Sequence, residues 1–329
     1  MIWLTWRQHR AQAIAGAMLI ALAAAVFLTY GASIRGTYTQ DGIGACLVQG
    51  TGSDHCQTAM HAFLDQFNGI DNHLLTWFTP VPGLIGAIVG ASVLGREYEH
   101  GTWRLAWTQA VPRTRWLTVR VLLVGAGIAV LSLSLSAVFA WFRSPVDRVS
   151  GRFTPGAFDL EGLSLTGYTL FAFAAGVLAG LLLRRTVPAI VVAFAAFMAV
   201  RLTVEFWLRP KYLTPVTELF APRVGFNQGA LSVPTSPGTQ GWILSQGLVD
   251  RTGHALSPAL QEQVSEKTSS FTNPAAAGAY LRGLGLHLQV VYQPADRFWT
   301  FQIIEAALYV GLAAALLAIA FWHLRRRSI

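Results

Sequence analysis

Six long apolar stretches constrain this chain more than any other feature of its sequence. They cover residues 11–34, 77–94, 121–141, 163–183, 187–208 and 299–322. At about 1.5 Å rise per residue, a helix over each would be long enough to cross a hydrocarbon layer of roughly 30 Å. Hydrophobic residues make up 53% of the 329 residues and charged residues only 12%, too few ionic groups for an ordinary globular surface. The sequence therefore predicts an all-α integral membrane protein with six transmembrane helices.

The basic residues indicate how these helices are oriented. Arginine is several times denser in four segments, 1–10, 95–120, 184–186 and 323–329, than in the segments that alternate with them. Because basic residues accumulate on the cytoplasmic side of membrane proteins, both termini are expected in the cytoplasm and the protein in the plasma membrane. Many of the basic residues behind the net charge of +8 would then lie near lipid phosphates, so nucleic acid is not an expected partner.

The first apolar stretch is preceded by an aromatic and basic segment. Residues 2–10 include Trp3, Trp6, Arg7 and Arg10, which suit an amphipathic helix lying on the inner membrane surface. The apolar core that follows is longer than that of a cleaved signal peptide. We therefore expect an N-terminal interfacial helix that stays attached to the first membrane helix.

The loops divide the chain into three parts. Residues 1–208 form a membrane domain of five helices, 209–298 a small extracellular insert between helices five and six, and 299–329 helix six with a basic cytoplasmic tail. Within the insert, 257–268 carries a helix N-cap and an early proline, and 286–293 alternates like a strand. The insert is thus expected to be folded.

Two cysteines, Cys46 and Cys56, lie in the predicted outer loop 35–76. On that side of the membrane a disulfide that closes a short loop is plausible, and two unpaired thiols are the alternative. The neighbouring His55 and His61 give no spacing of a closed zinc site, so no metal is expected.

Small residues recur on the membrane helices. Gly176 and Gly180 lie four residues apart on the fourth helix, the spacing that lets two helices approach closely in lipid. The sequence leaves open whether they pack within one chain or between two copies.

Charged residues inside the apolar stretches are rare and therefore informative. Arg201 and Glu205 lie four apart on the fifth helix, and Glu305 lies at a similar depth in the sixth. Because charge is unfavourable in the bilayer, an Arg201–Glu205 or Arg201–Glu305 pair is expected. Such a pair could serve packing alone, or gating and substrate passage.

Motifs for catalysis are missing from the sequence. It contains no G-x-x-x-x-G-K-[ST] phosphate loop, no H-E-x-x-H and no G-x-S-x-G. The chain is therefore not expected to be an enzyme, nor to bind a cofactor itself.

The cytoplasmic loop 95–120 carries the most specific pattern. It contains Glu97, Glu99, Gly101 and Thr102, followed about ten residues later by Pro112 and Arg113. This run, placed between the second and third of six helices, resembles the coupling loop of ABC transporter permeases of the type-2 exporter class. The six helices, the segment 2–10 and the large outer insert fit the same resemblance.

The resemblance implies a short cytoplasmic coupling helix that docks on a separate ATPase subunit. Its contact residues would be Glu97, Glu99, Gly101, Thr102 and Arg113. Two ATPase copies would bind ATP and Mg, and the permease would form a homodimer or a heterodimer with a second permease. An amphipathic or hydrophobic substrate would be exported by alternating access.

Two alternatives remain open from the residues alone. Glu99 could cap a helix or form a salt bridge within the chain, with Gly101 as a plain turn residue. The whole protein could instead be a membrane-anchored sensor or immunity protein whose outer insert binds a ligand without transport.

Overall fold

The computed structural model describes residues 2–49, 54–99, 113–224, 231–232, 241–271 and 273–326. The chain forms two compact units. The membrane unit comprises Met1–Ser150, Pro155–Arg209 and Trp299–Ile329, and the insert unit comprises Gly151–Thr154 and Pro210–Phe298. The insert unit thus includes residues 151–154, which lie far from the rest of this unit in the sequence.

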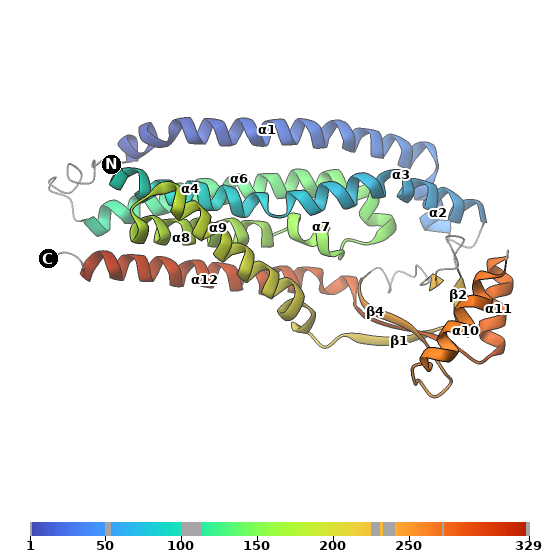
Figure 1. Cartoon of the computed structure of the whole chain (residues 1–329). Coiled ribbons are helices and arrows are strands. Elements are labelled where there is room, and N and C mark those ends of the chain that lie inside the picture. Colours follow the sequence, from blue (N-terminus) through green and yellow to red (C-terminus); the bar gives the residue numbers. More distant parts are fainter. Residues whose placement is uncertain are drawn as a thin grey trace. The chain divides into compact units, whose positions relative to one another are not determined.

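The membrane unit consists of helices, and the long ones lie side by side (Figure 1). They are α1 (Ile2–Gln40), α2 (Ile43–Gln49), α3 (Asp54–Phe78), α4 (Val81–Glu99), α6 (Arg113–Ser150), α7 (Pro155–Leu160), α8 (Ser164–Leu183), α9 (Thr186–Thr203) and α12 (Phe298–Arg326). After α9 the chain continues through a π-helical turn, Val204–Leu208, and a short 3-10 turn, Arg209–Lys211.

Five helices in the described part of the chain are long and apolar enough to span a membrane. These candidate spans are Gly16–Gln40, Thr114–Ser150, Ser164–Leu183, Thr186–Lys211 and Ala295–Arg326. The predicted span 77–94 corresponds to α4, which has 19 residues and is not among them. Its last turn carries Arg96, Glu97 and Glu99, which shorten the apolar stretch. Six crossings therefore remain a prediction, and a multi-pass membrane protein is what the helices support.

The N-terminal part of the membrane unit differs from the sequence-based expectation. The predicted interfacial helix at 2–10 is not a separate element, because α1 runs without a break for 39 residues and contains no proline. The predicted outer loop 35–76 is largely helical, since it contains the end of α1, all of α2 and most of α3.

A disulfide joins α2 to α3. It links Cys46 with Cys56, whose Cα atoms are 5.4 Å apart. Both cysteines are buried beside an aromatic cluster that includes Phe63 and Phe67 of α3 and Phe139 of α6. The bond therefore fixes the α2–α3 connection next to this cluster.

Helices α4 and α8 pack backbone against backbone. A Cβ atom on Gly176 of α8 would lie 2.6 Å from Ala91 N and 2.7 Å from Ala87 O. On the α4 side, Gly90 similarly leaves room for the backbone of Phe173. The glycine pattern thus serves packing within the chain, because these contacts need residues without side chains.

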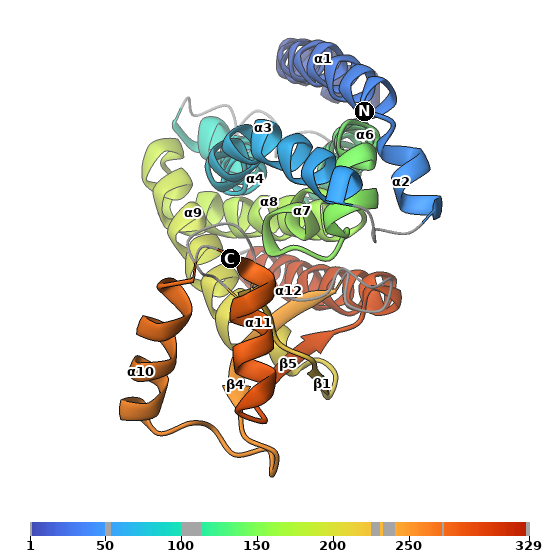
Figure 2. The same cartoon turned by 90° about the vertical axis from the view of Figure 1, so that its right-hand side faces the viewer.

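An antiparallel sheet and two helices form the insert unit (Figure 2). The elements are β1 (Val216–Phe220), β2 (Arg223–Val224), β3 (Leu231–Ser232), β4 (Trp242–Val249), α10 (Pro258–Ser269), α11 (Pro274–Gly283) and β5 (His287–Gln293). The three-stranded sheet has the order β1-β5-β4, and β2 pairs with β3 separately. The all-α fold class therefore describes the membrane unit, and the insert adds a sheet of which the sequence predicted one strand.

Two local predictions for the insert are confirmed. The helix expected at 257–268 is α10, and the side chain of Ser257 accepts a hydrogen bond from Leu260 N at its start. The strand expected at 286–293 is β5, whose Leu288, Val290 and Tyr292 are buried at alternate positions. Both follow from short-range patterns that need no tertiary contact.

We predict that Gly176→Ala destabilises the membrane unit by about 1–3 kcal/mol, because the added methyl group meets backbone atoms of α4 that cannot turn aside. Gly127→Ala on α6 is the matched control, since its Cβ would meet nothing within 4 Å. Thermal unfolding in detergent measures both. Equal melting temperatures for the two variants would contradict the close α4–α8 contact.

Candidate functional site

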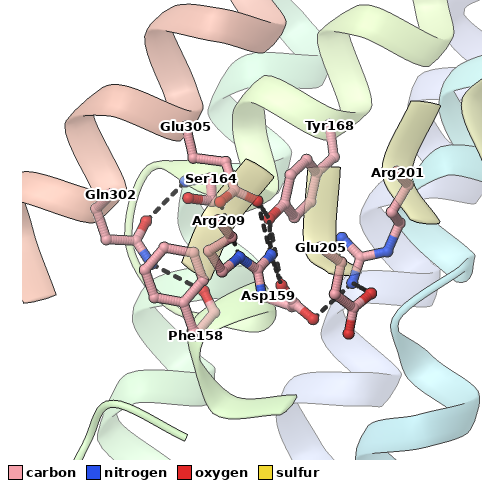
Figure 3. Close-up of polar contacts among 9 residues, drawn as sticks. All are labelled: Phe158, Asp159, Ser164, Tyr168, Arg201, Glu205, Arg209, Gln302 and Glu305. Atoms are coloured by element: carbon pink, nitrogen blue, oxygen red, sulfur yellow. Dashed lines mark hydrogen bonds and ion pairs between the residues drawn. The ribbon is translucent and has the colours of Figure 1, made fainter. Parts of the chain in front are cut away.

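Five buried side chains meet where α8 begins, α9 ends and α12 begins (Figure 3). We call these residues the charge cluster: Asp159 of α7, Tyr168 of α8, Arg201 of α9, Arg209 after the π-helical turn, and Glu305 of α12. Each is at most 3% exposed. The cluster lies at the opposite end of α9 from its first residue, Thr186.

Arg209 is the centre of the cluster. Its Nη2 lies 2.6 Å from Asp159 Oδ1 and 2.7 Å from Glu305 Oε1, and its Nε donates to Glu305 Oε2 at 2.9 Å. The pairing with Glu305 is therefore bidentate, the geometry in which a guanidinium binds a carboxylate most strongly. The Phe158 ring lies under the guanidinium, 4.6 Å from ring centre to Cζ.

Arg201 approaches Asp159 from the other side. Its Nη2 lies 2.5 Å from Asp159 Oδ2 and 3.8 Å from Glu205 Oε2. Asp159 is thus held between two guanidinium groups. Burial by itself would raise the pKa of this carboxyl group, but the charges of Arg209 and Arg201 outweigh it and keep the pKa below its usual value. Asp159 is therefore ionised.

Tyr168 connects the acids of the cluster. Its hydroxyl group forms a short hydrogen bond with Glu305, lies 3.2 Å from Asp159 Oδ1 and accepts from Arg209 Nη2 at 3.1 Å. Its ring packs edge-on against Tyr309, with 4.7 Å between ring centres. One residue of α8 thus contacts partners from α7, α12 and the end of α9.

The charges of this site do not balance. Asp159, Glu205 and Glu305 supply three carboxyl groups, whereas Arg201 and Arg209 supply two guanidinium groups. Within the described residues, one nitrogen of each arginine, Nη1, is buried without a hydrogen-bond partner. Water or a polar group that moves in could satisfy these donors. The cluster therefore holds two buried donor nitrogens beyond those that bind its carboxylates.

The segment between α7 and α8 positions Asp159. Gln302 of α12 donates from Nε2 to Phe158 O at 2.8 Å and accepts at Oε1 from Ser164 N at 2.9 Å. Gly162 adopts a positive φ of 72° where the chain passes this glutamine. Its carbonyl accepts from Ser136 Oγ of α6 at 3.0 Å. Both ends of the short segment are thereby fixed to long helices.

The π-helical turn Val204–Leu208 brings Arg209 into the cluster. In a regular α-helix a residue eight positions after Arg201 would be rotated away by about 80°. The wider π-helical turn reduces this rotation, so that Arg201 and Arg209 both reach Asp159. Such turns are frequent at functional sites.

The sequence identified part of this site. The expected Arg201–Glu205 pair is present but loose, and Glu305 pairs with Arg209 instead of Arg201. Asp159 and Arg209 lie outside the predicted helices 121–141, 163–183 and 187–208, and Tyr168 carries no charge, which is why the charges within the predicted helices do not include them. The one available signal was Arg209 itself, a cation directly after an apolar helix.

The residues predicted to contact an ATPase are only partly described. Glu97 forms a salt bridge with Arg120 of α6 at 2.8 Å. Glu99 accepts two hydrogen bonds from Thr186, the first residue of α9. The predicted contacts Gly101 and Thr102 lie outside the described residues, as does the side chain of Arg113. Glu99 therefore caps the start of α9, which is the alternative role that the sequence left open for it.

A metal site is not formed in the part of the chain that the structure describes, since no three His, Cys, Asp or Glu side chains there could hold an ion. Comparison with protein families gives one result: the family model described as "ABC-2 membrane transporter related" matches residues 17–209. No curated protein and no solved structure matches the chain.

We predict that Arg209→Met destabilises the membrane unit by about 3–5 kcal/mol, because Asp159 and Glu305 keep buried charges that lose their main partner. Glu205→Gln should change stability by less than about 1 kcal/mol, since this side chain is 24% exposed and its ion pair is 3.8 Å long. Thermal unfolding compares the two. Adding Glu305→Met to Arg209→Met should recover part of the loss, and a further loss would contradict the pairing.

Proposed function

Because this chain belongs to the ABC-2 membrane transporter related family, we propose that it is the permease subunit of an exporter driven by a separate ATPase. The observation that carries the proposal is the extent of the family match, residues 17–209. It runs from the first candidate span through the cytoplasmic segment after α4 to Arg209 of the charge cluster. Permease function is common to the family, whereas direction and cargo belong to the proposal.

The ATPase binds the cytoplasmic segment 95–120. Glu97 and Glu99 already have partners within the chain, so the contact falls mainly on Gly101, Thr102 and the first residue of α6, Arg113. Two ATPase subunits, each with ATP and Mg, would act on two permeases, either identical or different. Both termini lie in the cytoplasm and the protein in the plasma membrane, as the arginine distribution favours.

The charge cluster acts as the gate of this permease at the outer side. It holds the ends of α8, α9 and α12 together through buried ion pairs. Such pairs are stable when complete and unfavourable when one member is missing, so the cluster suits a transition between two discrete arrangements. The cargo is amphipathic or hydrophobic and passes when these helix ends separate.

We predict that an ABC ATPase subunit co-purifies with this chain from detergent-solubilised membranes. A photo-reactive p-benzoylphenylalanine at position 102 should cross-link to it, because Thr102 lies in the proposed contact. The same residue in place of Leu133, an exposed position within α6, should not.

Absence of both co-purification and cross-link would overturn the permease proposal. Ligand binding by the insert unit without any ATPase would then favour a membrane-anchored sensor or immunity protein.

A further inference from the structure

The last residue of α4 is bonded to the first residue of α9. Glu99 Oε1 accepts from Thr186 N at 2.9 Å, and Glu99 Oε2 accepts from Thr186 Oγ1 at 2.7 Å. The partial positive charge of the helix N-terminus also stabilises a carboxylate in this position. We call this pair of hydrogen bonds the Glu99–Thr186 contact.

The contact does more than cap α9. A helix is ordinarily capped by the residue just before it, yet Arg185 makes no side-chain cap here. The cap comes instead from another helix, 87 residues away in the sequence. It therefore joins two helices that no local turn connects.

Packing around the contact is close. A Cβ atom on Gly95 of α4 would lie 2.9 Å from Thr186 Oγ1 and 3.0 Å from Thr186 Cα. One helical turn of α4 thus lies directly on the start of α9. Farther along, Ala87 and Ala91 of α4 pack with Ala189 and Ala193 of α9. The two helices share an interface that begins at the contact.

Helix α9 then runs from the contact to the charge cluster. From Thr186 to Arg201 the rise along α9 is about 22 Å, at 1.5 Å per residue, and the π-helical turn Val204–Leu208 then leads to Arg209. Arg201 and Arg209 at its far end bind Asp159 and Glu305. The Glu99–Thr186 contact and the charge cluster thus lie at the two ends of one helical segment.

We propose that Glu99 and Thr186 are positioning residues for transport: they transmit a displacement of the end of α4 to α9, and through α9 to the charge cluster. This inference rests on the proposed permease function, because the displacement comes from the ATPase bound after α4. The Glu99–Thr186 contact itself touches neither ATP nor cargo.

The test uses the complex with its ATPase in nanodiscs and hydrogen–deuterium exchange of residues 204–211. In the wild type, trapping ADP and vanadate should change exchange there at least threefold. Thr186→Val removes the hydroxyl donor without changing side-chain size, and should abolish that change while assembly and ATP hydrolysis persist. Thr186→Ser should restore it.

Thr203→Val is the control, because Thr203 Oγ1 donates only within α9, to Ala199 O at 2.8 Å. It should behave as the wild type.

A full response in Thr186→Val would overturn the inference, and so would loss of ATPase binding in that variant, which would place Thr186 in the docking surface. Failure of the wild-type chain to bind an ATPase would instead overturn the proposed function. The two failures are therefore distinguishable.

Discussion

The bidentate pairing of Arg209 with Glu305, with Asp159 as a third partner, is the interaction on which the membrane unit depends. In an apolar layer these groups are stable only together, because an unpaired buried charge is strongly unfavourable. The pairing requires Arg209 to reach the cluster, which accounts for the π-helical turn that follows α9. It also accounts for the short segment that folds back between α6 and α8. Sequence-distant parts of the chain thus converge on one guanidinium group.

A second constraint acts on the helices that lead to this site. Glycines let α4 and α8 approach backbone to backbone, and α9 lies against α4 through alanines. Helices packed so closely move together more readily than they slide, since their contacts leave no space to rearrange. The Glu99–Thr186 contact adds to this packing two hydrogen bonds between the last residue of α4 and the first residue of α9.

The sequence predicted what depends on local pattern or on rare charges. The apolar stretches, the α10 helix and the β5 strand follow from periodicity and capping, and Arg201 and Glu305 were recognisable as charges in apolar surroundings. Asp159 could not be recognised, because only the tertiary fold turns its segment inward. Arg209 was missed because a π-helical turn has no sequence signature. The Glu99–Thr186 contact joins residues 87 positions apart, so no spacing rule reveals it.

In the proposed transport cycle, movement passed along α9 opens the charge cluster. Cryo-EM structures of the complex with its ATPase, one nucleotide-free and one with ATP trapped, test this most directly. We expect Arg209 to separate from Glu305 in one of the two states, while Glu99 stays bonded to Thr186 in both. A charge cluster that is intact in both states, beside an ATPase that has closed on ATP, would contradict it.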